Sequence, residues 1–104
     1  MVYTKWDEFM EKRVKTAKQL ERHFKGAANH RRIEILLVVS KNKDLTLEDI
    51  SEMVQCNIKT TSEHTRRLVH AGLLDKKYKG RTVLHTLSPY GSIFCAFIRT
   101  FQHS

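Results

Sequence analysis

Hydrophobic residues recur at helical spacing through the first third of this chain. Over residues 4–25 they fall near one stripe at alternating steps of three and four, which predicts a long amphipathic helix. Gly26 is expected to close it, and a second helix follows over about residues 27–40. The run 33–39 is apolar nearly all round and is placed at the centre of the core. A β-strand is the alternative interpretation of this run, but polar residues lead into it without a break.

Two shorter helices joined by a turn come next. Thr46 and Asp49 form a capping-box pair that starts the first of them. Residues 55–57 form the turn, and Asn57 is a good N-cap for the second helix, over residues 58–71. One face of this second helix is suited to rest on the core, through Thr61, Thr65 and Leu68. The opposite face is polar and carries Lys59, Ser62, Glu63, Arg66 and His70.

A hairpin is predicted after these helices. Gly72 ends the preceding helix by taking a positive φ. Residues 73–78 and 81–87 then form two strands around a Lys79-Gly80 tip, because apolar and polar residues alternate along the second of them. Ser88-Pro89, an N-cap followed by a first-turn proline, opens a last helix with aromatic residues along one face.

These elements predict a winged helix-turn-helix, mainly α with a small β-hairpin. A length of 104 residues leaves room for one domain. Its parts are expected to be contact helices for a second subunit at 1–26 and 89–104, the helix-turn-helix at 45–71, and the wing at 73–88. The residues expected in the subunit contact are apolar: Trp6, Met10, Leu20, Phe94, Phe97 and Phe101. Packing of these residues on the chain's own core is the alternative.

The distribution of charged residues along the chain indicates a class of binding partner. Nineteen Lys and Arg against eleven Asp and Glu give a formal net charge of +8. Residues 57–82 hold seven basic and two acidic residues, whereas residues 33–56 hold two basic and five acidic ones. Because the excess is concentrated on the helix 58–71 and the wing, a nucleic acid is the favoured partner.

Several other classes are disfavoured. A hydrophobic content of 40% is too high for a disordered chain. No apolar run is long enough for a membrane span and the N-terminus is charged, so a cytoplasmic protein without a membrane partner is expected. An enzyme is not expected, because Ser62 and His64, two residues apart on a helix, point away from each other. A glycine-rich phosphate loop is also missing.

The helix 58–71 is expected to be the recognition helix in the major groove. Its first turn carries residues suited to phosphates or base edges: Lys59, Thr60 and Ser62. Arg66 is suited to bidentate pairing with guanine, and Arg67 and His70 are flanking candidates. Glu63 has two possible roles, as an acceptor for a cytosine amine or as a tether for the neighbouring arginines, and we favour the tether.

The wing segment 76–82 supplies candidates for phosphate or minor-groove contacts, namely Lys76, Lys77, Lys79 and Arg81. If a dimer neutralises about six to eight phosphates, log K should fall against log salt with a slope of about −5 to −7. The alternative is a solvated basic hairpin without a partner.

Three runs of residues resemble the ArsR/SmtB-type winged-helix regulators. They are the segment 45–50, the pattern from Ser62-x-His64 to Ala71-Gly72-Leu73-Leu74, and Gly80-Arg81-x-Val83. The resemblance covers about residues 27–88. It implies a homodimer built from the first and last helices on a near-palindromic operator. It also implies recognition positions at Lys59, Thr60, Ser62, Glu63 and Arg66.

The resemblance bears on metal sensing as well. The family's thiolate site is a Cys-x-Cys on the supporting helix, and the matching positions here are Thr46 and Glu48. A second family site needs carboxylates on the last helix, but residues 83–104 contain none. Since a metal ion needs several converging ligands, neither a metal nor another cofactor is expected. We expect His64 to be satisfied within the fold.

The function expected is therefore a sequence-specific regulator of transcription, of the repressor type, that binds double-stranded DNA as a homodimer. One alternative is a winged helix that binds proteins, or a non-specific architectural module, whose basic wing meets an acidic partner. Another is an unusual nucleic acid, such as a left-handed duplex or RNA. The prolines expected in such a wing are missing, because Pro89 is the only proline.

Overall fold

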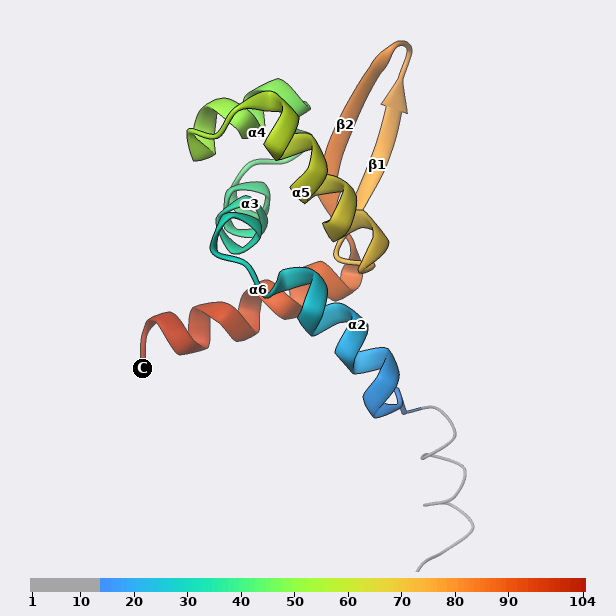
Figure 1. Cartoon of the computed structure of the whole chain (residues 1–104), viewed down its shortest axis with the longest axis vertical. Coiled ribbons are helices and arrows are strands. Elements are labelled where there is room, and N and C mark those ends of the chain that lie inside the picture. Colours follow the sequence, from blue (N-terminus) through green and yellow to red (C-terminus); the bar gives the residue numbers. More distant parts are fainter. Residues whose placement is uncertain (1–13) are drawn as a thin grey trace, which may run out of the picture.

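The structure is a computed structural model that describes residues 14–104. Within this range, five helices and one two-stranded hairpin follow in the order α2 (Ala17–Ala27), α3 (His30–Lys41), α4 (Leu47–Val54), α5 (Ile58–His70), β1 (Leu74–Lys79), β2 (Thr82–Leu87) and α6 (Pro89–Gln102). The hairpin rises beside α4 and α5, while α2 and α6 lie at the other end of the molecule (Figure 1). None of the helices within residues 14–104 is long and apolar enough to cross a membrane.

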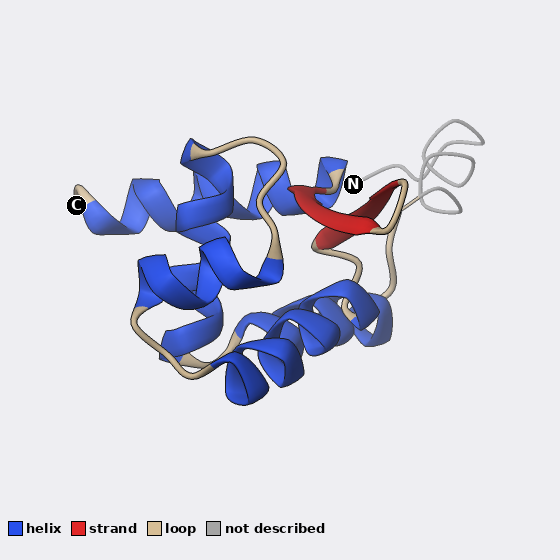
Figure 2. Cartoon of the chain, turned by 90° about the horizontal axis from the view of Figure 1, so that it is seen from above, coloured by secondary structure: helices blue, strands red, loops and turns tan. Residues whose placement is uncertain are grey.

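Helix α3 lies at the centre of the core, as its apolar sequence predicts. Its buried residues Ile35, Leu36 and Val39 belong to one cluster with Ile50 of α4 and Leu68 of α5. The strand alternative for this segment is wrong, because the run is helical throughout. Figure 2 shows the helices grouped together with the hairpin at their margin. The core therefore supports α5 from behind and leaves one of its sides to solvent.

The first helix is shorter than predicted. Thr16 has an extended backbone and forms a capping box with Gln19, so that α2 begins at Ala17. A capping box satisfies two otherwise unpaired amides at a helix start. Because residues 14–16 are not helical, the prediction of one continuous helix over residues 4–25 is wrong.

The end of this helix also differs from the prediction. Gly26 lies inside α2 and does not close it, and the next helix begins at His30. Asn29 sets that start, since its side-chain oxygen accepts hydrogen bonds from two backbone amides of the first turn. A Cβ at position 26 would overlap the Cβ of Ala71 at the end of α5. Gly26 therefore allows the close approach of α2 to the end of α5.

The wing is an antiparallel hairpin in which Leu74 pairs with Leu87 and Lys79 with Thr82. Its tip is Gly80-Arg81, one residue later than predicted, and Gly80 has a φ of +62°. On the other side of β2, Leu45 and His85 exchange two backbone hydrogen bonds of 2.7 and 3.2 Å. Strand β2 is thus held between β1 and the chain that leads into α4.

His85 is buried beneath the wing, and its Nδ1 lies 3.1 Å from the carbonyl oxygen of Leu45. Burial lowers the pKa of His85, and this effect is partly opposed by the hydrogen bond to Leu45. An unfolded histidine has a pKa of about 6.5. Below that pH the unfolded chain binds more protons than the folded one, so the free energy of unfolding falls as the pH drops.

We therefore expect a lower urea midpoint at pH 5.5 than at pH 7.5. His85→Phe removes the titrating ring and should reduce this difference between the two pH values. Urea unfolding followed by circular dichroism, with wild type and variant side by side, measures the effect. An identical pH dependence in the two proteins would contradict it.

Candidate nucleic-acid interface

Helix α5 begins where its sequence predicts. The side chain of Asn57 accepts a 2.8 Å hydrogen bond from the backbone amide of Thr60, and the hydroxyl of Thr61 donates to the carbonyl of Asn57 at 2.9 Å. The core-facing residues Thr61, Thr65 and Leu68 are buried as expected. Because the amide of Thr60 is engaged by Asn57, Thr60 offers a ligand its exposed hydroxyl and not its amide.

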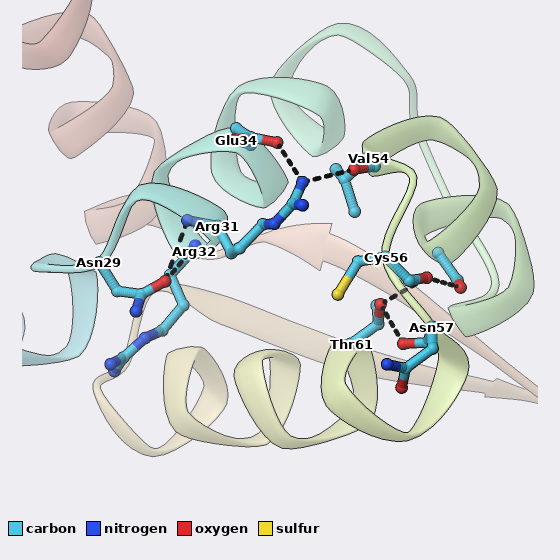
Figure 3. A network of polar contacts seen from close by, with 9 residues as sticks. Asn29, Arg31, Arg32, Glu34, Val54, Cys56, Asn57 and Thr61 are labelled. Carbon is cyan, nitrogen blue, oxygen red and sulfur yellow. Dashed lines mark hydrogen bonds and ion pairs between the residues drawn. The ribbon is translucent and has the colours of Figure 1, made fainter.

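The turn before α5 is fixed by a network that links three helices (Figure 3). Arg31 of α3 donates to the carbonyl of Val54 at 2.9 Å and pairs with Glu34 at 3.4 Å. The carbonyl of Cys56 accepts hydrogen bonds from the hydroxyls of Ser51 and Thr61. These contacts satisfy groups at the end of α4 and set the angle at which α5 leaves the turn.

Every side chain predicted to contact DNA is exposed in the structure. They are Lys59, Thr60, Ser62, Glu63, Arg66, Arg67 and His70 on α5, and Lys76, Lys77, Lys79 and Arg81 on the wing. Exposure makes these groups available to a ligand but does not by itself say which of them act together. Their grouping follows from the packing of α5 against the hairpin.

A groove of about 220 Å³ lies between α5 and the wing. Ser62 and Arg66 line it from α5, and Lys76, Val83 and His85 line it from the hairpin. Since Lys76 pairs with His85 in the sheet and side chains alternate along a strand, Lys77 and Lys79 stand on the opposite face. We call this the α5–wing groove. Of the four basic wing residues predicted, only Lys76 lines it.

Lys77 and Arg81 are placed differently from Lys76. The Nζ of Lys77 lies 3.6 Å from a carboxylate oxygen of Asp44, on the loop between α3 and α4. Arg81 lies in the hairpin tip beside Gly80, at the far end of the wing (Figure 1). The wing therefore offers basic groups at its base, along its outer face and at its tip.

Glu63 ties two arginines together on α5. One of its oxygens lies 2.6 Å from Arg66 Nη2 and 3.3 Å from Arg67 Nε. The hydrogen bond from Arg66 holds the pKa of Glu63 below its usual value, against the opposing effect of desolvation and with further help from the charges of Arg66 and Arg67. Glu63 therefore stays ionised at neutral pH and orients both guanidinium groups. Of its two expected roles, this geometry corresponds to the tether.

His64 lies next to this pair on the half-buried side of α5. Burial lowers the pKa of His64, and the positive charge of Arg32 lowers it further. Within residues 14–104 its Nδ1 is buried without a hydrogen-bond partner, so the expectation that this histidine is satisfied is wrong for that nitrogen. In the same part of the chain, no three His, Cys, Asp or Glu side chains converge to hold a metal ion.

A second exposed surface lies on α2 and α6. Leu20 and Phe24 of α2 are exposed, and the ring of Phe24 lies 5.4 Å from that of Phe94 and 6.3 Å from that of Phe97. The stack continues along α6, with 4.9 Å between the centroids of Phe97 and Phe101. We call these five residues the aromatic face. The other two residues predicted for a subunit contact, Trp6 and Met10, lie outside the described residues.

The side of α2 that rests on the core was not anticipated. His23 is buried there, and its Nδ1 lies 2.6 Å from the carbonyl of Ala71 at the end of α5. Its ring also packs against Tyr90 of α6, with 5.3 Å between the centroids. A polar residue in an otherwise apolar stripe gives little sign of burial, because its partner is 48 positions away.

This geometry was compared with known proteins. Residues 29–76 match the model of the family described as bacterial regulatory protein, arsR family. Over this segment, a little under half of its length, the chain is similar to the regulators of that family. The matched segment runs from the N-cap of α3 to the middle of β1 and thus contains the whole of α5. The resemblance predicted from the sequence is confirmed.

Solved structures show the same winged-helix fold. One is the homodimeric winged helix-turn-helix DNA-binding domain Mb0332 of Mycobacterium bovis, with a TM-score of 0.75 and 19% identity over 97% of this chain and 88% of that one. A second is reduced HlyU of Vibrio cholerae, with a TM-score of 0.73 and 24% identity over 90% of this chain and 96% of that one. A third is the transcriptional repressor BigR of Xylella fastidiosa, with a TM-score of 0.71 and 15% identity over 90% of each chain. No curated protein sequence matches this chain.

Proposed function

We propose that this protein regulates transcription by binding double-stranded DNA as a homodimer, and that it acts as a repressor. One observation carries the proposal: α5 and the wing present exposed basic and hydroxyl side chains on both sides of the α5–wing groove. A helix backed by a packed core, with a basic ribbon beside it, suits the major groove and the adjoining phosphates. The arsR-family match over α5 supports the same role.

In this proposal the residues divide by task. Arg66 reads a base edge, because its guanidinium is exposed on α5 and is oriented by Glu63. Lys59, Thr60 and Ser62, in the first turn of α5, contact phosphates or bases. The wing holds the DNA backbone through Lys76 on the groove side and through Lys79 and Arg81 farther out. Arg67 and His70 flank the recognition surface. Lys77 forms an ion pair with Asp44, which partly neutralises its charge.

The dimer is proposed to form through the aromatic face. Phe97 and Phe101 are 46% and 67% exposed, which is unusual for large apolar side chains packed against each other. A homodimeric assembly is described for Mb0332. A symmetric pair of recognition helices would read two half-sites of a near-palindromic operator. A repressor role is supported by the name of BigR, which has the same fold.

Two substitutions separate base reading from backbone holding. Arg66→Ala should weaken binding to a preferred duplex by about 1–3 kcal/mol and reduce its advantage over a scrambled duplex. Lys79→Ala should weaken binding to both duplexes by a similar factor and make the salt slope about one shallower for each phosphate that is no longer neutralised. Fluorescence anisotropy with a duplex selected from a random pool measures both effects.

Lys18→Ala serves as the control, since Lys18 is an exposed lysine of α2 outside the proposed interface. It should change neither affinity nor preference by more than a small factor. If Arg66→Ala left both affinity and preference unchanged, the assignment of this face of α5 would be wrong.

A further inference from the structure

A cationic pocket lies outside the α5–wing groove, between α2, α3 and the C-terminal half of α5. Its volume is about 480 Å³, larger than that of the groove. The charged and titratable residues that line it come from three helices: Arg22, Lys25, Arg32, Arg66, Arg67 and His70. We call it the cationic pocket. Arg66 lines both it and the α5–wing groove.

The positive charge of this pocket is only partly compensated. Glu63 is shared between Arg66 and Arg67, and Lys25 lies 3.8 Å from Glu21. Among residues 14–104, no carboxylate comes within ion-pair distance of Arg22 or Arg32. The pocket therefore holds more positive than negative charge, and an anion entering it meets a favourable field.

Arg32 also carries an unused donor. Its side chain leaves α3 in the direction opposite to that of Arg31 (Figure 3). Its Nη1 donates to the carbonyl of Gly26 at 3.0 Å. Within the described part of the chain, the Nε of Arg32 is buried and has no partner. An unsatisfied buried donor is unfavourable, and its usual explanation is an ion or solvent molecule that completes it. Because this Nε is closed to solvent, an anion in the pocket would reach it only after the guanidinium turns toward the pocket.

We propose that the cationic pocket binds a phosphate group, carried either by a small molecule or by the DNA backbone. Arginine forks match tetrahedral phosphate oxygens with two parallel hydrogen bonds, and three helices here supply four arginines. The volume admits more than one phosphate, so a diphosphate is the natural small probe. A phosphate bound here lies against Arg66 and therefore beside the α5–wing groove.

The first arm of the test uses inorganic pyrophosphate without DNA. Wild-type protein is titrated at constant ionic strength, and binding is followed by ¹H–¹⁵N NMR. We expect saturable shifts at the amides of Gly26, Arg67 and Ala71. Arg22→Gln should raise Kd by about five- to tenfold. Lys18→Gln, on the same helix but outside this pocket, should leave Kd within about twofold of the wild-type value, as expected for an exposed charge.

Arg32→Gln removes the deepest donor but also the hydrogen bond to Gly26, so its thermal unfolding must be measured alongside. The more exposed Arg22→Gln keeps the test decisive even if Arg32→Gln does not fold. Saturable binding that is about five- to tenfold weaker in Arg22→Gln, but not in Lys18→Gln, supports a small-molecule phosphate. Saturable binding that Arg22→Gln leaves unchanged would place the anion outside the cationic pocket and contradict the proposal.

The second arm measures the salt dependence of binding to a random duplex. If the DNA backbone supplies the phosphate, Arg22→Gln should make the slope of log K against log salt shallower by about 0.9 per phosphate, and Lys18→Gln should not. Because the first arm contains no DNA, its outcome is independent of the proposed function. The inference is overturned if pyrophosphate does not saturate and Arg22→Gln leaves the salt slope unchanged, even where DNA binding itself is strong.

Discussion

Phe97→Glu is expected to convert the proposed dimer into a monomer. Phe97 lies in the middle of the aromatic face, between Phe94 and Phe101, and an isologous dimer would bury two copies of it. Because Phe97 is 46% exposed in one protomer, the dimer adds only about half of its burial, or about 1 kcal/mol per protomer, and losing this corresponds to about a thirtyfold rise in the dimer Kd. Burial of the new carboxylate adds to this loss.

DNA binding should fall with the dimer, because one protomer alone engages only one half-site. We expect a loss of about a hundredfold or more for a two-half-site duplex, since the second contact is no longer intramolecular. Analytical ultracentrifugation and anisotropy on the same samples measure the two effects together.

Met53→Glu is a matched control for this substitution. Met53 is 46% exposed, the same fraction as Phe97, but lies on α4 at the other end of the molecule (Figure 1). The Met53→Glu substitution introduces the same charge at an equally exposed apolar site and should leave the dimer unchanged. A Phe97→Glu protein that still sediments as a dimer would show that the aromatic face is not the subunit contact.

Gly91→Ala is expected to have the largest effect on stability. Gly91 lies in the first turn of α6, and a Cβ there would overlap the carbonyl oxygen of Leu73. That carbonyl is held in place by the backbone amide of Ser88 at 3.1 Å, so it has little freedom to move. Alanine would gain about 1 kcal/mol in helix propensity, but a clash with backbone should cost more than ordinary overpacking of about 1–3 kcal/mol.

We therefore expect a net loss of about 3 kcal/mol, a large fraction of the stability of a domain of this size. The thermal midpoint should drop by about 12 °C or more. Differential scanning calorimetry measures it. Ser92→Ala, at an exposed position in the same turn, should have little effect or raise the midpoint slightly. A Gly91→Ala protein as stable as wild type would mean that α6 does not pack as closely on the start of β1 as described.

Local chemistry explains why much of this fold was predictable. Asn57, Thr46 and Ser88 cap the helices that they were expected to cap, since an N-cap contact spans only two or three residues. Gly72 takes the positive φ expected at the end of α5. The buried face of α5 also follows from helical spacing alone. These features depend on neighbours in sequence, which the pattern of residue types records.

Other features depend on contacts that no local pattern contains. The start of α2 was misplaced because the apolar stripe continues past Thr16, and the capping box with Gln19 outweighs it. The position of Lys76 on the groove side of the wing follows from strand register, which a difference of one residue in the tip reverses. The cationic pocket joins Arg22 and Arg32 to α5 across some 35 to 45 positions, and the uneven charge of the chain was its only sign in the sequence.

The central claim, that α5 and the wing form a sequence-specific DNA interface, is tested most directly by a salt titration of the purified protein. Binding to a random duplex and to a selected duplex is measured together with the mass in solution. The account predicts a dimer, a slope of about −5 to −7 in log K against log salt, and a preference of at least about a hundredfold for the selected sequence. Absence of a preferred sequence, or of binding near about 150 mM salt, would contradict it and favour an architectural or protein-binding module.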